Sequence, residues 1–461
     1  MINRVAFCTF GCRINQYDTE TVRTLLEESG RFRAVAMHRA ADVYVVNTCS
    51  VTAQADASAR KAIRRIRSEQ PMAKIIVTGC YAQRAPDRIA ELPGVALVLG
   101  VPDRTRIVAE IERCLATIPR DGESNGNGTR KIAVSRVSTA RAFPEIPITR
   151  MMERSRAVVK IQDGCNGACS FCIIPQTRGR SRSRRPQRVI EQITRLVDNG
   201  YREIVLAGVH LGDYGFDLDR KPTLPDLIHR ILAIPDLVRF RLSSIGPTAI
   251  SEEIIRLMAT EDKFARHFHI PLQSGSDPIL ARMNRDYRAA QFERLLRDIT
   301  DAVPDCGIGT DIICGFPGET DARFQETVAR ISDLPLTYLH PFTYSARPGS
   351  PAQSYPEQIP SEQRKSRTRI LKQLSRVKNR AFRQRYPGRI ARVLLESQGK
   401  KSIKNPGENN GQMGTTYFGW TDNYLRVTAQ GAPTGTDGLE TVRVTDIDDD
   451  GLSGVFESGK R

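Results

Sequence analysis

Three cysteines that lie close together in the chain have the residue type and spacing suited to binding a soft metal. Cys165, Cys169 and Cys172 stand at CxxxCxxC spacing directly after a short apolar segment. Thiolates bind zinc, copper(I) and iron–sulfur clusters, and clustered guanidinium groups bind phosphates. The arginines that follow, which we expect to contact a polyanion, are Arg178, Arg180, Arg182, Arg184 and Arg185. This stretch therefore predicts a metal centre beside an anion-binding strip.

The number of cysteines in this stretch distinguishes between kinds of metal centre. A structural zinc site needs four ligands, and a redox CxxC pair uses only two cysteines. Three thiolates suit a [4Fe–4S] cluster with one open iron. An open iron can bind the amino and carboxylate groups of S-adenosylmethionine (SAM), and an electron from the cluster then releases a 5′-deoxyadenosyl radical. The spacing therefore favours radical SAM chemistry over other uses of a metal.

Three further cysteines lie far apart in the sequence but occupy equivalent places in it. Cys12 follows the first expected strand by a few residues, and Cys49 and Cys80 end the second and third. The carboxyl ends of parallel strands meet at one edge of an open sheet, where ligands bind. We therefore expect a second three-thiolate site there. The alternative is that each cysteine is only a small buried residue.

Strand and helix patterns divide the chain into four parts. Residues 1–118 alternate strand and helix, which predicts an open parallel α/β sheet, and the polar residues 119–150 are typical of a linker. Residues 151–386 contain six further strand–helix repeats, which predict a partial (β/α)6 barrel, and end in a basic helix at 361–386 without a clear apolar face. Residues 387–461 alternate polar and apolar positions between turns, which predicts a small β-barrel.

The barrel prediction also gives candidate residues for the cofactor pocket. Active sites of such barrels lie at the carboxyl ends of the strands. Gly208, Ser244, Gln273 and Asp311 fall at these ends, so we expect them to line the SAM pocket. Each of them could instead serve only to end a strand.

The positive charge of the chain is concentrated in two segments. Of the formal net charge of +17, residues 360–392 contribute +11 and residues 178–188 contribute +6. Such patches indicate a nucleic-acid partner, and a solvated basic face is the alternative. The chain has no secretory signal and no run of about 18 apolar residues, so we expect a cytoplasmic protein without a membrane partner. Its ten cysteines are then free thiols or metal ligands.

Several segments resemble the radical SAM methylthiotransferases. CNGACSFC is similar to the radical SAM signature, and FGCRINQYDTE, VNTCSVT and VTGCYAQ are similar to the N-terminal domain of that family. HIPLQSGSD, DIICGFPGET and the terminal β-barrel, which resembles a TRAM domain, fit the same family. The resemblance implies that Cys12, Cys49 and Cys80 hold a second [4Fe–4S] cluster, which carries the transferred sulfur.

The resemblance also implies a mechanism and partners. One SAM would methylate a sulfur on the second cluster, and another would be cleaved to the radical that activates a C–H bond. Flavodoxin or ferredoxin would supply electrons. The family acts either on adenosine 37 in the anticodon loop of tRNA or on a ribosomal protein aspartate, and the two basic patches favour tRNA.

Within the tRNA-modifying enzymes, CIIPQTRGRSRSR and TDNYLRV look most like the branch that acts on N6-threonylcarbamoyladenosine. Gln176 departs from the aromatic residue expected in that motif. The alternatives are N6-isopentenyladenosine in tRNA and the ribosomal protein. An alternative from another class is an RNA-binding redox sensor that holds iron–sulfur clusters without catalysis.

Overall fold

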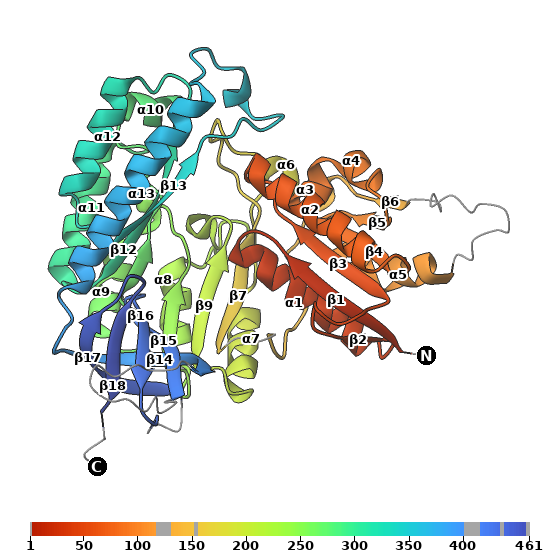
Figure 1. Cartoon of the computed structure of the whole chain (residues 1–461), viewed down its shortest axis with the longest axis horizontal. Helices are drawn as coiled ribbons and strands as arrows, with labels where there is room; N and C mark the ends of the chain where they lie inside the picture. The colour runs from red at the N-terminus through yellow and green to blue at the C-terminus, as the bar shows by residue number, and fades with distance from the viewer. Residues whose placement is uncertain (1, 117–130, 152–154, 401–414, 434–437, 458–461) are drawn as a thin grey trace, which may run out of the picture.

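The computed structural model contains an α/β domain, a partial barrel and a small closed β-barrel (Figure 1). It describes residues 2–116, 131–151, 155–400, 415–433 and 438–457. Among these residues, none of the helices combines the length and apolar character needed to cross a membrane.

A six-stranded parallel sheet forms the N-terminal domain, in the order β2-β1-β3-β4-β5-β6. Its central strand β3 (Val43–Thr48) is buried along its whole length. Such continuous runs of apolar, β-branched residues are typical of parallel strands in a sheet that is covered on both faces. The other strands are β1 (Asn3–Thr9), β2 (Phe32–Ala34), β4 (Lys74–Gly79), β5 (Val95–Leu99) and β6 (Lys131–Ala133).

Helices cover both faces of this sheet. The apolar side chains of α1 and α5 pack on one face, and those of α2, α3 and α4 pack on the other. The Thr52 side chain caps the N-terminus of α2 by accepting from the Ala55 amide. The bounds are α1 (Arg13–Glu28), α2 (Ala53–Glu69), α3 (Cys80–Arg84), α4 (Pro86–Ala90) and α5 (Ile107–Ala116).

The predicted linker at 119–150 is wrong in one part. Strand β6 pairs in parallel with β5 and forms an edge of the first sheet, so residues 131–133 belong to that domain. The strand has only three residues and none of them is buried, so no alternation of apolar residues marks it in the sequence. Residues 117–130 lie outside the described residues.

Six parallel strands form the central barrel. Strands β7, β9 and β10 pair as one sheet and β11, β12 and β13 as another, and bridges such as Ser244↔His269 join β10 to β11. The predicted partial (β/α)6 barrel is confirmed. The strands are β7 (Arg156–Asp163), β9 (Glu203–Gly208), β10 (Arg239–Leu242), β11 (His267–His269), β12 (Gly307–Cys314) and β13 (Tyr338–Thr343), and the short β8 (Arg182–Ser183) pairs antiparallel with β7.

The barrel core is the largest apolar cluster of the protein, and amphipathic helices cover it. Thr223 and Asp226 form a capping box that starts α8, and the Thr320 side chain caps α12. The helices are α6 (Ile174–Arg178), α7 (Pro186–Asp198), α8 (Leu224–Leu232), α9 (Glu252–Thr260), α10 (Asp277–Arg282), α11 (Ala289–Ala302) and α12 (Asp321–Asp333).

Helix α13 (Ser361–Arg383) connects the central barrel to the C-terminal β-barrel (Figure 1). It packs against β13 and β12 and buries Leu371 and Phe382. The helix therefore has a buried face, contrary to the prediction. This face is not clearly apolar in the sequence because two of its buried positions, Arg367 and Arg383, are arginines. The closed barrel has the order β14-β15-β16-β18-β17, with bounds β14 (Ile390–Lys400), β15 (Thr415–Thr421), β16 (Arg426–Gln430), β17 (Leu439–Ile447) and β18 (Leu452–Phe456).

Candidate functional site

Cys12, Cys49 and Cys80 meet at one edge of the N-terminal sheet. They follow β1, β3 and β4, which are neighbours in the sheet, and Cys80 is the first residue of α3. Gly11 has a φ of +99°, and a Cβ built there would lie 2.9 Å from the Cys49 Sγ. Only glycine fits this close approach between the two cysteine loops. The structure thus brings the three predicted residues together.

Burial opposes the ionisation of two of these thiols, Cys12 and Cys49. Burial raises the pKa of Cys12, and it raises the pKa of Cys49 to about 12, with smaller contributions from the neighbouring cysteines. The positive charge of Arg178 acts in the opposite direction on both. A bound iron would replace the protons, because metal ligation requires thiolates. Three neighbouring thiols at one edge of the sheet are a donor set that fits an iron–sulfur cluster.

The second cysteine triad lies in the loop after β7, at the carboxyl end of the barrel. Each of its three sulfurs accepts one N–H. The Gly167 amide donates to Cys165 Sγ over 3.2 Å, and the Ile174 amide donates to Cys172 Sγ over 3.4 Å. Such donors compensate negative charge on cluster sulfurs. This loop therefore fits the predicted [4Fe–4S] cluster.

Cys169, the middle cysteine of this loop, has an arginine partner that the sequence did not indicate. Arg285 donates from its guanidinium to Cys169 Sγ over 3.0 Å and to the Tyr287 hydroxyl over 3.2 Å. Burial alone would lower the pKa of Arg285, but its interactions with Tyr287 and Cys169 outweigh burial and raise the pKa. Arg285 lies before α11, more than one hundred residues after the cysteine loop. No local pattern marks it, so only the fold reveals this contact.

The four residues expected in the SAM pocket lie on neighbouring strands. Gly208 ends β9, Ser244 follows β10, Gln273 follows β11 and Asp311 is in β12. Gln273 adopts a φ of +71° and pairs with the β12 backbone, where its amide donates to the Asp311 carbonyl over 2.8 Å. The structure therefore places all four at one end of the barrel. Their contact with SAM stays a prediction.

Two histidines outside the predicted site residues flank Asp311. His269 Nε2 lies 2.8 Å from Asp311 Oδ1, and His340 Nδ1 lies 3.5 Å from the same oxygen. Burial alone would raise the pKa of Asp311, but the two histidines outweigh it and lower the pKa to about 2. Both histidines lie on barrel strands, in HFHIPLQ and LTYLHPF, and this placement could have indicated them.

The prediction that Arg178, Arg182 and Arg184 contact RNA is wrong, because all three are buried. Arg182 donates to the Arg178 carbonyl over 3.0 Å, and Arg184 donates to Glu145 over 2.8 Å. Residues 181–184, which include the short strand β8, are all buried, and Arg178 is a buried residue at the end of α6. Arg180 and Arg185 are exposed. Their contact with RNA stays a prediction.

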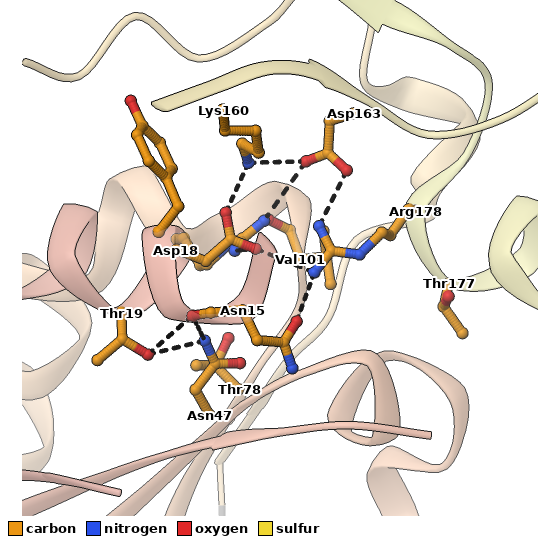
Figure 2. Close-up of polar contacts among 12 residues, drawn as sticks. Asn15, Asp18, Thr19, Asn47, Thr78, Val101, Lys160, Asp163, Thr177 and Arg178 are labelled. Atoms are coloured by element: carbon orange, nitrogen blue, oxygen red, sulfur yellow. Dashed lines mark hydrogen bonds and ion pairs between the residues drawn. The ribbon is translucent and has the colours of Figure 1, made fainter. Parts of the chain in front are cut away.

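Arg178 lies in a buried charge network between the two domains (Figure 2). Its guanidinium donates to Asp163 Oδ1 over 2.9 Å and to Asp18 Oδ2 over 3.0 Å. Lys160 bridges the same two aspartates, at 2.5 Å from Asp18 and 2.9 Å from Asp163. Asp18 belongs to α1 of the N-terminal domain, whereas Asp163 ends β7 of the barrel. The network therefore fixes the domains against each other.

Asn15, which lies beside Arg178 in Figure 2, also contacts the N-terminal cysteine loops. Its side-chain amide donates to the Phe10 carbonyl over 2.8 Å and to the Thr48 carbonyl over 3.0 Å, so it ties together the segments before Cys12 and Cys49. Its Oδ1 accepts from Arg178 over 2.6 Å. One side chain thus links one cysteine site to the segment that follows the other.

Comparison with known proteins identifies the family. Residues 4–100 match the uncharacterized protein family UPF0004, and residues 159–331 match the radical SAM superfamily. The threonylcarbamoyladenosine tRNA methylthiotransferase MtaB of Bacillus subtilis is 38% identical over 93% of this chain and 90% of its own length. This chain belongs to the radical SAM methylthiotransferase family. It is therefore an enzyme, with SAM and a [4Fe–4S] cluster as cofactors, as the sequence predicts.

Two further relatives show how far the likeness extends. The tRNA-2-methylthio-N(6)-dimethylallyladenosine synthase of Clostridium botulinum strain Loch Maree is 30% identical over 90% of each chain. The solved structure of TsrM, a radical SAM methyltransferase from Kitasatospora setae, has a TM-score of 0.56 and 16% identity over 77% of each chain. The likeness to TsrM concerns the fold alone.

Proposed function

We propose that this enzyme attaches a methylthio group to C2 of N6-threonylcarbamoyladenosine at position 37 of tRNA. The observation that supports the proposal most directly is a contact between two helices that lie beside the two cysteine triads in the chain. Helix α6 begins two residues after Cys172 and packs against α3, which begins with Cys80. Transfer between two centres requires such proximity. The relatives named for this substrate are also more similar to the chain than the dimethylallyl enzyme.

Each residue set has a distinct role in this proposal. Cys165, Cys169 and Cys172 would hold the cluster that binds SAM, with Gly208, Ser244, Gln273 and Asp311 around that cofactor. Cys12, Cys49 and Cys80 would hold a second [4Fe–4S] cluster. When bound, the clusters and two molecules of SAM supply the radical, the methyl group and the sulfur. The chain itself orients both sites through Arg285, Asn15 and the buried network.

Polar groups near the carboxyl end of the barrel favour the threonylcarbamoyl substrate. The His340 side chain is 55% exposed, and the Asp311 carboxylate lies between it and His269. A threonylcarbamoyl group carries a hydroxyl that can donate to the Asp311 carboxylate and a carboxylate that can accept from the exposed His340. An isopentenyl chain offers His340 no polar group, and sites built for hydrogen bonding to a substrate reject such analogues strongly.

This function requires a contact with the tRNA and a source of electrons. We expect Arg180 and Arg185, which are exposed, to contact the tRNA near adenosine 37. A flavodoxin or ferredoxin would reduce the clusters. The enzyme would act in the cytoplasm, where tRNA is available.

Nucleoside mass spectrometry of tRNA tests this function. Cells that lack the gene should lose 2-methylthio-N6-threonylcarbamoyladenosine and accumulate the nucleoside without the methylthio group. The wild-type gene should restore the signal, and a matched gene carrying Cys165→Ala should not. Loss of the 2-methylthio-isopentenyl nucleoside instead would transfer the assignment to the other tRNA branch. An unchanged tRNA profile would reject tRNA as the substrate.

A further inference from the structure

Helix α13 carries a row of basic side chains on its outer face. Its five members are Lys365, Arg369, Lys372, Arg376 and Arg380, which we call the α13 stripe, and all five are exposed. At about 100° per residue, spacings of four, three, four and four residues keep them within roughly 80° of arc. The buried side chains Leu371 and Phe382 lie on the opposite side. The stripe is therefore one continuous surface and not a charge distributed around the helix.

The fold does not use the charges of the α13 stripe. Within the described part of the chain, none of its five side chains makes a hydrogen bond or an ion pair. The other basic residues of the helix differ: Arg367 pairs with Glu319 and Asp321, Lys378 donates to the Leu334 carbonyl over 2.7 Å, and Arg383 donates to the Gly451 carbonyl. Those residues hold the helix in place, whereas the stripe is left for another partner.

The position of α13 connects the stripe to both functional ends of the molecule. At its start, Arg364 donates to the Tyr344 carbonyl over 2.8 Å and lies against Gly315, directly after β12, which carries Asp311. At its end, Phe382 packs in the core of the C-terminal β-barrel. The stripe rises about 22 Å at 1.5 Å per residue. It can therefore contact several phosphates along one nucleic-acid strand.

We propose that the α13 stripe binds the phosphate backbone of the RNA substrate between the catalytic end of the barrel and the C-terminal β-barrel. The inference rests on the proposed function for the identity of the RNA. Five exposed cations without acidic partners match a polyanion, and release of counterions makes such contacts favourable. Because phosphates carry no base identity, the stripe supplies affinity and register and does not select adenosine 37.

The salt dependence of RNA binding tests this proposal. The probe is tRNA isolated from cells that lack the enzyme, and the protein is the full chain. The variant Arg369→Gln/Lys372→Gln/Arg376→Gln removes three charges from the stripe. The matched control, Arg195→Gln/Arg294→Gln/Arg297→Gln, removes three exposed charges from α7 and α11 that have no ion-pair partner among the described residues. Circular dichroism should show that both variants fold like the wild type.

The two variants should differ in the slope of log K against log salt. We expect the slope of the stripe variant to be smaller than that of the wild type by about 2 to 3, and its affinity at low salt to fall at least about tenfold. The control should retain the wild-type slope. Equal slopes in the two variants would overturn the proposal.

Two further results separate the possible failures. If the wild type itself does not bind tRNA, the proposed function fails together with the stripe. If the stripe variant still binds tRNA like the wild type but flavodoxin reduces its clusters more slowly, the stripe docks an acidic protein. The assignment of the stripe to RNA is then wrong.

Discussion

Burial opposes the formation of thiolates at both cysteine sites, because it raises the pKa of Cys165 and Cys172 as it does that of Cys12 and Cys49. Each sulfur of the loop Cys165–Cys172 already accepts an N–H, which stabilises a thiolate. At the N-terminal site, burial raises the pKa of Cys12 and Cys49, and the nearby Arg178 opposes this shift. The ligands of the two sites come from separate segments of the chain, so the loss of one cysteine should affect mainly its own site.

Single cysteine substitutions should separate two activities. Cys165→Ala removes a ligand of the site that binds SAM, so it should abolish formation of 5′-deoxyadenosine. Cys49→Ala leaves that site intact, so it should keep part of the SAM cleavage but stop methylthiolation. Chromatography of the nucleoside products measures both reactions in the purified enzyme.

Cys114→Ala is the control for this experiment, because Cys114 lies in α5 beside the apolar core. It should retain both reactions. Full methylthiolation by Cys165→Ala and Cys49→Ala would contradict the assignment of two cluster sites.

The residues of the site were predictable from the sequence only where spacing or strand order determines them. CxxxCxxC spacing places Cys165, Cys169 and Cys172 in one loop, and the ends of parallel strands place the other three cysteines at one edge. Arg285 and Arg178 were not predictable in the same way. Arg285 reaches Cys169 across the barrel, and Arg178 is buried because Asp18, from another domain, pairs with it.

At the scale of single elements, the turn between β1 and α1 brings Cys12 close to Cys49. Gly11 lies in this turn with a φ of +99°, and a Cβ there would lie 2.6 Å from the Cys49 Cβ. Gly11→Ala should therefore displace one cysteine loop and lower the iron content of the N-terminal site. It should also reduce the free energy of unfolding by about 1–3 kcal/mol. Iron analysis and denaturant titration measure the two effects.

Gly30→Ala is a matched control for the backbone strain. Gly30 also has a positive φ, of +69°, but a Cβ there meets no atom within 4 Å. This variant should lose stability and keep its iron. Equal iron contents in the two variants would show that the close approach to Cys49 does not matter.

The elements themselves were predictable to different degrees. The central strands are runs of buried β-branched residues and stand out, as in β3. The strands β2 and β6 have three residues each, and pairing with a neighbour defines them more than their own sequence does. The sequence of helix α13 shows that it is basic but does not show which face packs against the protein. Arg367 lies on that face, and it can be buried there only because Glu319 and Asp321 of another segment pair with it.

At the scale of the whole molecule, the relative position of the two cysteine sites depends on a buried interface. Asp18 and Asp163 come from different domains and share Lys160, Arg178 and Arg104 as partners. Burial alone would raise the pKa of Asp18, but these cations outweigh it and hold the pKa well below its ordinary value. The folded state therefore requires both aspartates as anions.

Asp18→Asn tests this interface, because the amide preserves the shape and removes the charge. Breaking a buried ion pair leaves an uncompensated cation, so the free energy of unfolding should fall by about 3–5 kcal/mol. Because the pKa of Asp18 is lowered on folding, its contribution is present above about pH 4 and is lost as the pH falls below that value. The destabilisation relative to the wild type should therefore be constant at neutral pH and shrink below about pH 4.

Denaturant titrations at several pH values measure this difference, and Asp298→Asn, at an exposed position on α11, should match the wild type throughout. A destabilisation by Asp18→Asn that stays the same down to pH 2 would show that shape, and not charge, holds the two domains together.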